Sequence, residues 1–111
     1  MTQSQYVFIE SRDPFESTDT GFVADTAVTL RARGRAVAVF LLQNGVLATR
    51  TGAHGSQVSR LVAAGVPVLA DDFSLRERGI EASELRDGVQ EASIGTLVDL
   101  MLRPNTKAVW H

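Results

Sequence analysis

Residues 36–42 read AVAVFLL, an unbroken apolar run that ends at the polar stretch Gln-Asn-Gly, residues 43–45. A strand with one face in water alternates apolar and polar side chains, whereas this run is apolar on both of its alternating faces. Such a strand is typical of the centre of a parallel sheet that helices cover on both sides. The run therefore favours an α/β fold.

The other segments alternate between strand-like and helix-like patterns. Short apolar runs indicate four further strands: residues 6–9, residues 66–70, a short strand from Val89, and residues 106–110. Apolar residues at helical spacing, each group followed by Gly or Pro, indicate three helices: residues 21–33, 56–64 and 94–102. This alternation predicts a single-domain, three-layer α/β/α fold over residues 1–111, with a mostly parallel sheet of about five strands.

Three segments carry weaker signals. Residues 10–20 are polar and contain Pro14, which indicates a long loop with room for a lid. Residues 43–45 are typical of a turn, because Asn and Gly tolerate positive φ. Residues 79–87 are polar and lack a clear period, so their secondary structure stays open.

Charge and hydropathy exclude several classes of partner. Eleven basic and thirteen acidic residues give a formal net charge of −2, so no nucleic-acid partner is expected. The longest apolar run is far shorter than the roughly 20 residues of a membrane helix, so no membrane partner is expected. The N-terminal MTQSQY lacks the basic and apolar regions of a signal peptide, which favours a cytoplasmic protein.

Candidate site residues follow from the predicted topology. In an open parallel sheet, ligands bind beyond the carboxyl ends of the strands. The side chains expected there, which could share one rim, are Glu10, Ser11, Arg12, Gln43, Asn44, Asp71, Asp72, Trp110 and His111. We take six of them, together with Ser74 of the adjoining helix start, as candidates for ligand binding; the six are Glu10, Arg12, Gln43, Asn44, Asp71 and Asp72. Residues 10–12 could equally form a solvated loop, and residues 43–45 only a turn.

Asp71 and Asp72 stand where a strand passes into a helix. One carboxylate could cap the amide groups of the helix around residues 74–78, an interaction that stabilises by about 1 kcal/mol. Alternatively, two carboxylates in different environments could form a binding or acid–base pair. Adjacent residues in a turn often point in different directions, so both interpretations stay open.

Motifs for cofactors are absent from the sequence. Residues 52–56, Gly-Ala-His-Gly-Ser, have neither the glycine spacing nor the lysine of a phosphate-binding loop. His54 and His111 lack a second ligand at metal-binding spacing, and the sequence has no cysteine. No Gly-x-Ser-x-Gly element precedes a helix. We therefore expect no cofactor and no metal.

Four segments together resemble the DsrE/DsrF-like family, which includes the sulfur-relay subunits TusB, TusC and TusD. The segments are YVFIESRDPFES, VAVFLLQNGV, AGVPVLADDFSLRERGI and NTKAVWH. The most specific part is a strand and site loop followed by Arg78, Gly79 and Ile80. The resemblance implies a small α/β domain that assembles into dimers, trimers or hexamers, with persulfide sulfur carried on a cysteine in members that transfer it.

The family cysteine would fall at Asp71, and the second cysteine of some members at Ser74. Both positions lack a thiol, and a carboxylate cannot hold a persulfide because the carrier must be a nucleophilic sulfur. Sulfur transfer by this chain is therefore not expected. Three interpretations stay open. The first is a non-catalytic oligomer subunit or binding partner, connected with a DsrE-family or sulfur-relay protein. The second is an enzyme or small-ligand binder that uses Asp71, Asp72 and Asn44, and the third is a purely structural or unrelated role of an α/β domain.

Self-association is expected on a second ground. An α/β domain of 111 residues has a modest core, which cannot easily hold all of its large aromatic side chains. Those in question are Phe15, Phe22, Phe73 and Trp110. We therefore predict a homo-oligomer.

Overall fold

The computed structural model describes residues 4–13, 20–51 and 56–111, and within these ranges five strands form one sheet. The strands are β1 (Gln5–Glu10), β2 (Ala36–Leu41), β3 (Val68–Asp71), β4 (Val89–Ala92) and β5 (Thr106–Trp110). Their spatial order is β4-β3-β2-β1-β5, and every neighbouring pair is parallel. The predicted parallel sheet of an α/β/α fold is confirmed, and its central strands are the ones with the most continuous apolar sequence.

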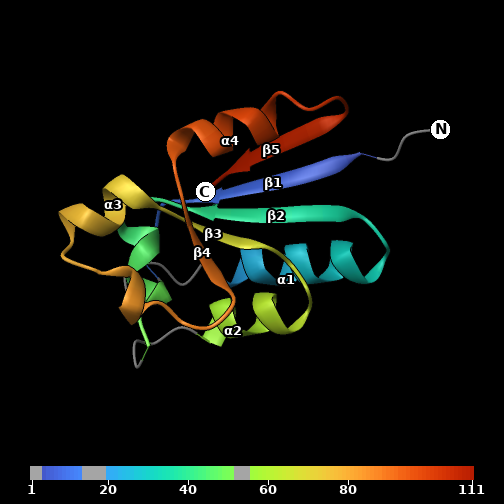
Figure 1. Ribbon diagram of the computed structural model, residues 1–111. Helices are drawn as coiled ribbons and strands as arrows, with labels where there is room; N and C mark the ends of the chain where they lie inside the picture. Colours follow the sequence, from blue (N-terminus) through green and yellow to red (C-terminus); the bar gives the residue numbers. More distant parts are fainter. Residues whose placement is uncertain (1–3, 14–19, 52–55) are drawn as a thin grey trace.

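Helices cover the two faces of the sheet unequally (Figure 1). The elements are α1 (Thr20–Ala32), α2 (Ser56–Ala63), α3 (Asp72–Glu77), α4 (Ile94–Met101) and the short 3-10 helices η1 (Gln43–Thr49) and η2 (Ala82–Glu84). Figure 1 shows α1 and α2 on one face, α4 alone on the other, and α3 beyond the carboxyl ends of the strands. The short helix η1 packs against α3 and β3 at that same end.

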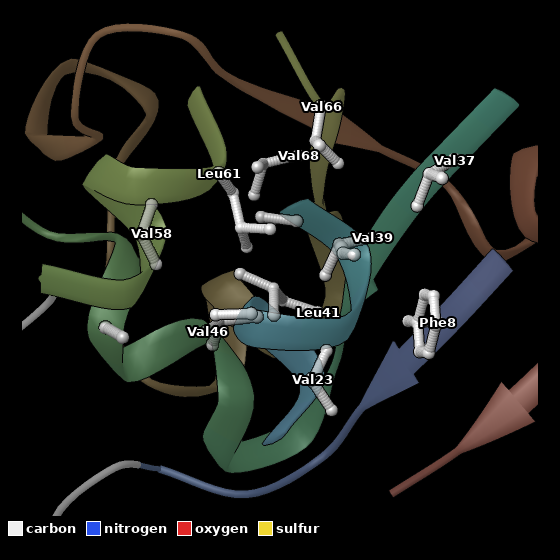
Figure 2. Packing of buried hydrophobic residues seen from close by; sticks show 14 of the residues in the cluster. Phe8, Val23, Val37, Val39, Leu41, Val46, Val58, Leu61, Val66 and Val68 are labelled. Carbon is white, nitrogen blue, oxygen red and sulfur yellow. The ribbon is translucent and has the colours of Figure 1, made fainter. Parts of the chain in front are cut away.

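The larger core lies between the sheet and helices α1 and α2. Figure 2 shows Val23 of α1 and Leu61 of α2 turned toward Val39 and Leu41 of β2. Each of these four side chains is at most 4% exposed. Because burial of one such side chain stabilises by about 1.5–3 kcal/mol, this face supplies most of the stability of the sheet.

The opposite face has a smaller core, and much of its apolar surface is uncovered. Its buried residues are Val7, Ile9, Phe40, Leu42 and Leu97. The helix expected over residues 94–102 is confirmed, but only Leu97 is buried within α4. We define the α4 surface as the exposed apolar side chains on this face: Ile94, Val98, Met101, Leu102 and Trp110. Trp110 belongs to it because its partner in β1 is Ile9, whose side chain faces the same core.

The contact face of α1 is centred on Val23 and Ala27, and Phe22 lies outside it. One local prediction was wrong. Residues 43–45 were expected to form only a turn, but they begin η1. There Gln43, not Asn or Gly, has the positive φ of 51°. Gly45 is needed for a different reason, since a Cβ at this position would overlap the carbonyl oxygen of Glu10.

The expected misfit of large aromatic side chains is confirmed for Phe22, Phe73 and Trp110, which are 58–64% exposed. Phe15 and Pro14 lie outside the described residues, as does His54. Residues 79–87, left open above, contain η2 and a bridge between Arg50 and Leu85. Over the described ranges, no helix has the length and apolar character that crossing a bilayer requires.

Candidate functional site

A cleft of about 690 Å³ opens beyond the carboxyl ends of β2, β3 and β5, on the α4 side of the sheet. Its volume falls within the range typical of small-molecule sites, about 300–1,000 Å³. The lining residues are Leu42, Gln43, Asn44, Asp71, Asp72, Phe73, Ser74, Glu77, Arg78, Ser93, Ile94 and Trp110. Residues far apart in sequence thus meet where the topology rule places ligands.

Asp71 is the best-buried acidic residue of the cleft, with 6% of its surface exposed. Its Oδ2 accepts a hydrogen bond from the backbone N–H of Ser74 at 2.9 Å and another from the Ser74 hydroxyl at 2.6 Å. The first bond caps the start of α3, so the capping interpretation is confirmed. Yet both Asp71 and Asp72 also line the cleft, so capping does not exclude a role in binding.

Ser74 joins the strand end to η1. Its hydroxyl donates to Asp71 and also accepts a hydrogen bond from the backbone N–H of Gln43 at 2.8 Å. The hydroxyl is thereby used as donor and as acceptor, and the strained backbone of Gln43 is held in place. A thiol or an alanine at position 74 could not make both bonds equally well.

Arg78 fixes the other side of the cleft. Its Nε and Nη2 donate to the side-chain oxygen of Asn44 at 3.2 and 3.0 Å, and its Nη1 donates to the carbonyl oxygen of Ser74 at 3.2 Å. Both acceptors are uncharged, so the guanidinium keeps its positive charge without an ion pair in these bonds. Asn44 and Arg78 therefore tie η1 to the end of α3 and shape the cleft wall.

The remaining cleft residues combine negative charge with apolar surface. Asp72 approaches Arg76 one helical turn away at 3.8 Å, a long and solvent-exposed ion pair. Glu77 is exposed at the rim. Phe73 and Trp110 are 58% and 64% exposed, and they offer aromatic surface next to these carboxylates.

Glu10 and Arg12 lie elsewhere. They line a second, smaller cavity on the α1 side of the sheet, because the side chain of Glu10 points to the same face as Phe8. Glu10 is 5% exposed, and both of its carboxylate oxygens contact Nδ1 of His111, at 2.9 and 2.8 Å. Burial raises the pKa of Glu10 above its ordinary value, and the contact with His111 opposes this shift only partly.

The structure therefore divides the expected rim in two. Gln43, Asn44, Asp71, Asp72, Ser74 and Trp110 share one cleft, whereas Glu10, Ser11, Arg12 and His111 lie together at the junction of β1 and β5. The reason is the alternation of side chains along a strand: Glu10 ends β1 and Asp71 ends β3, on either side of β2, and their side chains point to opposite faces of the sheet. A rule based on strand ends alone cannot make this distinction.

Sequence reasoning did not select Phe73, Glu77, Arg78 or Ile94 as site residues, although all four line the cleft. One signal was available for Arg78: it follows Ser74 by four residues, which places both on one face of a helix. Among the described residues, no group of three His, Cys, Asp or Glu side chains is arranged to hold a metal ion.

The sequence matches no family model and no curated protein. Solved structures do resemble it. The ychN protein from E. coli superposes with a TM-score of 0.87 at 21% identity, over 98% of this chain and 100% of that one. MTH1491 from Methanobacterium thermoautotrophicum, a protein of unknown function, gives a TM-score of 0.79 at 21% identity, over 98% and 100%.

A third similar structure is BT1422 from Bacteroides thetaiotaomicron, a conserved protein of unknown function. It gives a TM-score of 0.72 at 17% identity, over 96% of this chain and 95% of that one. At such low identity the likeness shows a common fold. The match over nearly the full length means that the cleft is built on an architecture that other bacterial and archaeal proteins share.

Proposed function

We propose that this protein is a non-catalytic DsrE/DsrF-like subunit that binds other chains, in the first place copies of itself. The observation that carries the proposal is the α4 surface. Five large apolar side chains on one face, 43–77% exposed, exceed the isolated apolar residues that a monomer usually presents. Association would bury them and complete the thinner of the two helical layers.

The composition of α4 supports self-association. Asp99 is the only charged residue between Ile94 and Met101. Interfaces between identical subunits are poor in charge and rich in aliphatic and aromatic residues at their centre. Because a two-fold interface brings the same patch of both subunits together, an apolar patch with little charge avoids repulsion between like charges.

The site position supports a non-catalytic role. In the resemblance given above, Asp71 stands where family members that transfer sulfur carry a cysteine. Asp71 is engaged by two hydrogen bonds from Ser74, and Ser74 occupies the second cysteine position. A capping network thus takes the place of the thiols. We propose that the protein supports an intracellular sulfur relay as a partner of a cysteine-bearing family member, without carrying sulfur itself.

Sedimentation velocity tests the oligomer. We expect the wild type to sediment as a homo-oligomer and the Val98→Glu/Leu102→Glu variant as a monomer, because two carboxylates in a buried apolar contact are costly. The matched control is Ala32→Glu/Ala63→Glu, which adds the same charges at exposed positions of α1 and α2. A wild type that remains monomeric at high micromolar concentration would refute the proposal.

A second function is favoured by the cleft itself. Its size, the convergence of Asp71, Asp72 and Asn44, and the exposed Trp110 suit a small ligand. In that case the protein is a ligand-binding protein or an enzyme that uses the carboxylates. Binding of small molecules that changes the fluorescence of Trp110, the only tryptophan in the sequence, is the corresponding test.

A further inference from the structure

We infer that the cleft at the carboxyl ends of β2, β3 and β5 accepts an organic cation, a primary ammonium or guanidinium group carried on an apolar stem. The inference rests on the second function proposed above, ligand binding at the cleft, and it specifies the chemical class of the ligand. Such a group could belong to a free amine or to a Lys or Arg side chain of a protein.

The charges of the lining select a cation. Asp71, Asp72 and Glu77 contribute three carboxylates, and Arg78 contributes the one cationic side chain. Arg78 directs three of its N–H groups to Asn44 and to the carbonyl oxygen of Ser74, so it is held as part of the wall. An incoming anion would therefore meet more negative than positive charge, whereas a cation would meet an excess of carboxylates.

Asp71 offers an unused acceptor atom. Its Oδ2 takes both hydrogen bonds from Ser74, and no described residue donates to its Oδ1. Among the described residues, the only fully enclosed side-chain oxygen or nitrogen without a partner is Thr106 Oγ1. Asp71 Oδ1 is therefore not fully enclosed, and Asp71 lines the cleft although 94% of the residue is buried. A buried carboxylate oxygen that lacks a donor is a strong acceptor for an ammonium or guanidinium N–H.

The apolar lining suits the stem of such a ligand. Leu42 and Ile94 line the same cleft as the rings of Phe73 and Trp110. Aromatic faces attract cations as well as apolar groups, and an exposed cation–π contact contributes about 0.5–1 kcal/mol. The ligand class that uses every part of the lining therefore combines a positive head with an apolar body.

Three probes of nearly equal shape separate charge from shape: phenethylamine is a cation, 2-phenylethanol is neutral, and 3-phenylpropanoate is an anion. Each is titrated into the wild-type protein while the fluorescence of Trp110 is followed. We expect saturable binding of phenethylamine, at least about fivefold tighter than the alcohol, and no saturable binding of the anion. Equal binding of the amine and the alcohol, or tighter binding of the anion, would overturn the inference.

Variants locate the effect. Asp72→Asn/Glu77→Gln removes two cleft charges without touching the cap that Asp71 provides, and we expect it to reduce the preference for the amine about fivefold. The matched control Asp87→Asn/Glu91→Gln removes two exposed charges away from the lining and should keep the preference. If both pairs of substitutions weaken amine binding equally, the effect is one of net charge and the site assignment is wrong.

A final arm identifies the source of the cation. The capped peptide acetyl-Ala-Lys-Ala-amide is compared with phenethylamine and with acetyl-Ala-Ala-Ala-amide. Tighter binding of the lysine peptide assigns the cleft to a protein side chain, and tighter binding of the amine assigns it to a small molecule. Binding of the alcohol alone would keep ligand binding and reject the cation, whereas the absence of binding by every probe would reject both.

Discussion

The two faces of the sheet are built from the same strands, but helices cover one face more completely than the other. On the α1/α2 face, helix residues such as Val23, Ala27, Val58 and Leu61 are each at most 3% exposed. On the α4 face a single helix buries Leu97 and leaves most of its other apolar side chains in water. The first face holds the fold together. The second carries the cleft and the α4 surface, which shows that apolar sequence alone does not say whether its partner belongs to the same chain.

The largest expected effect is on the free energy of unfolding, when the same substitution, Leu to Ala, is made once on each face of the sheet. Leu61→Ala removes a side chain that is 3% exposed and should lower the free energy of unfolding by about 3 kcal/mol. Leu102→Ala removes one that is 77% exposed and should change the stability of the monomer by less than about 0.5 kcal/mol. Urea denaturation at low protein concentration measures both, and similar losses would break the comparison.

Much of the fold could be predicted because its signals are local. The run at residues 36–42 identified a central strand, and Gly34, Gly65 and Pro104 marked the ends of helices. The order of the strands and the one-sided placement of α4 depend on contacts between distant segments, which no local pattern records. For the same reason, the spacing of residues 94–102 predicted a helix with an apolar face but not that this face would be exposed.

A middle-sized effect is expected at Asp71, on the cleft side of the sheet. Asp71→Ala removes the cap of α3 together with the partner of the Ser74 hydroxyl, and should cost about 1–2 kcal/mol. Asp71→Asn keeps an oxygen that accepts from the Ser74 backbone N–H, so its cost should be at most half as large. Chemical denaturation separates the two variants. Equal losses would show that the charge, and not the cap, is what position 71 supplies.

The smallest effect is a pH dependence on the closed α1/α2 side. Burial raises the pKa of Glu10, so the native state binds this proton more strongly than the unfolded chain does. The contribution of Glu10 to stability is therefore fully present below its unfolded pKa and is lost as pH rises through its native pKa. We expect the unfolding free energy of the wild type, relative to that of Glu10→Gln, to fall as the pH rises from the unfolded to the native pKa of Glu10.

The control is Glu91→Gln, which makes the same chemical change at an exposed position. A difference for Glu10→Gln that rises with pH would mean that the contact with His111 outweighs burial. In either case the measurement reports on the junction of β1 and β5, away from the cleft.

The candidate site was predictable in part. The rule of strand ends found Asn44, Asp71 and Trp110, because it depends only on the direction of parallel strands. It grouped Glu10 with them wrongly, since the face to which a strand end points requires the register. Arg78 escaped selection because its role comes from hydrogen bonds to Asn44, thirty-four residues earlier in the chain.

Hydroxyl-radical footprinting measures most directly whether the α4 surface is covered by another chain. In the single chain, Phe22 on α1 and Trp110 on the α4 surface are almost equally exposed, at 58% and 64%. In the wild-type protein at high concentration, we predict that Trp110 and Met101 are protected while Phe22 stays reactive. If Trp110 reacts as readily as Phe22 at every concentration, the α4 surface is bare in solution and the account is contradicted.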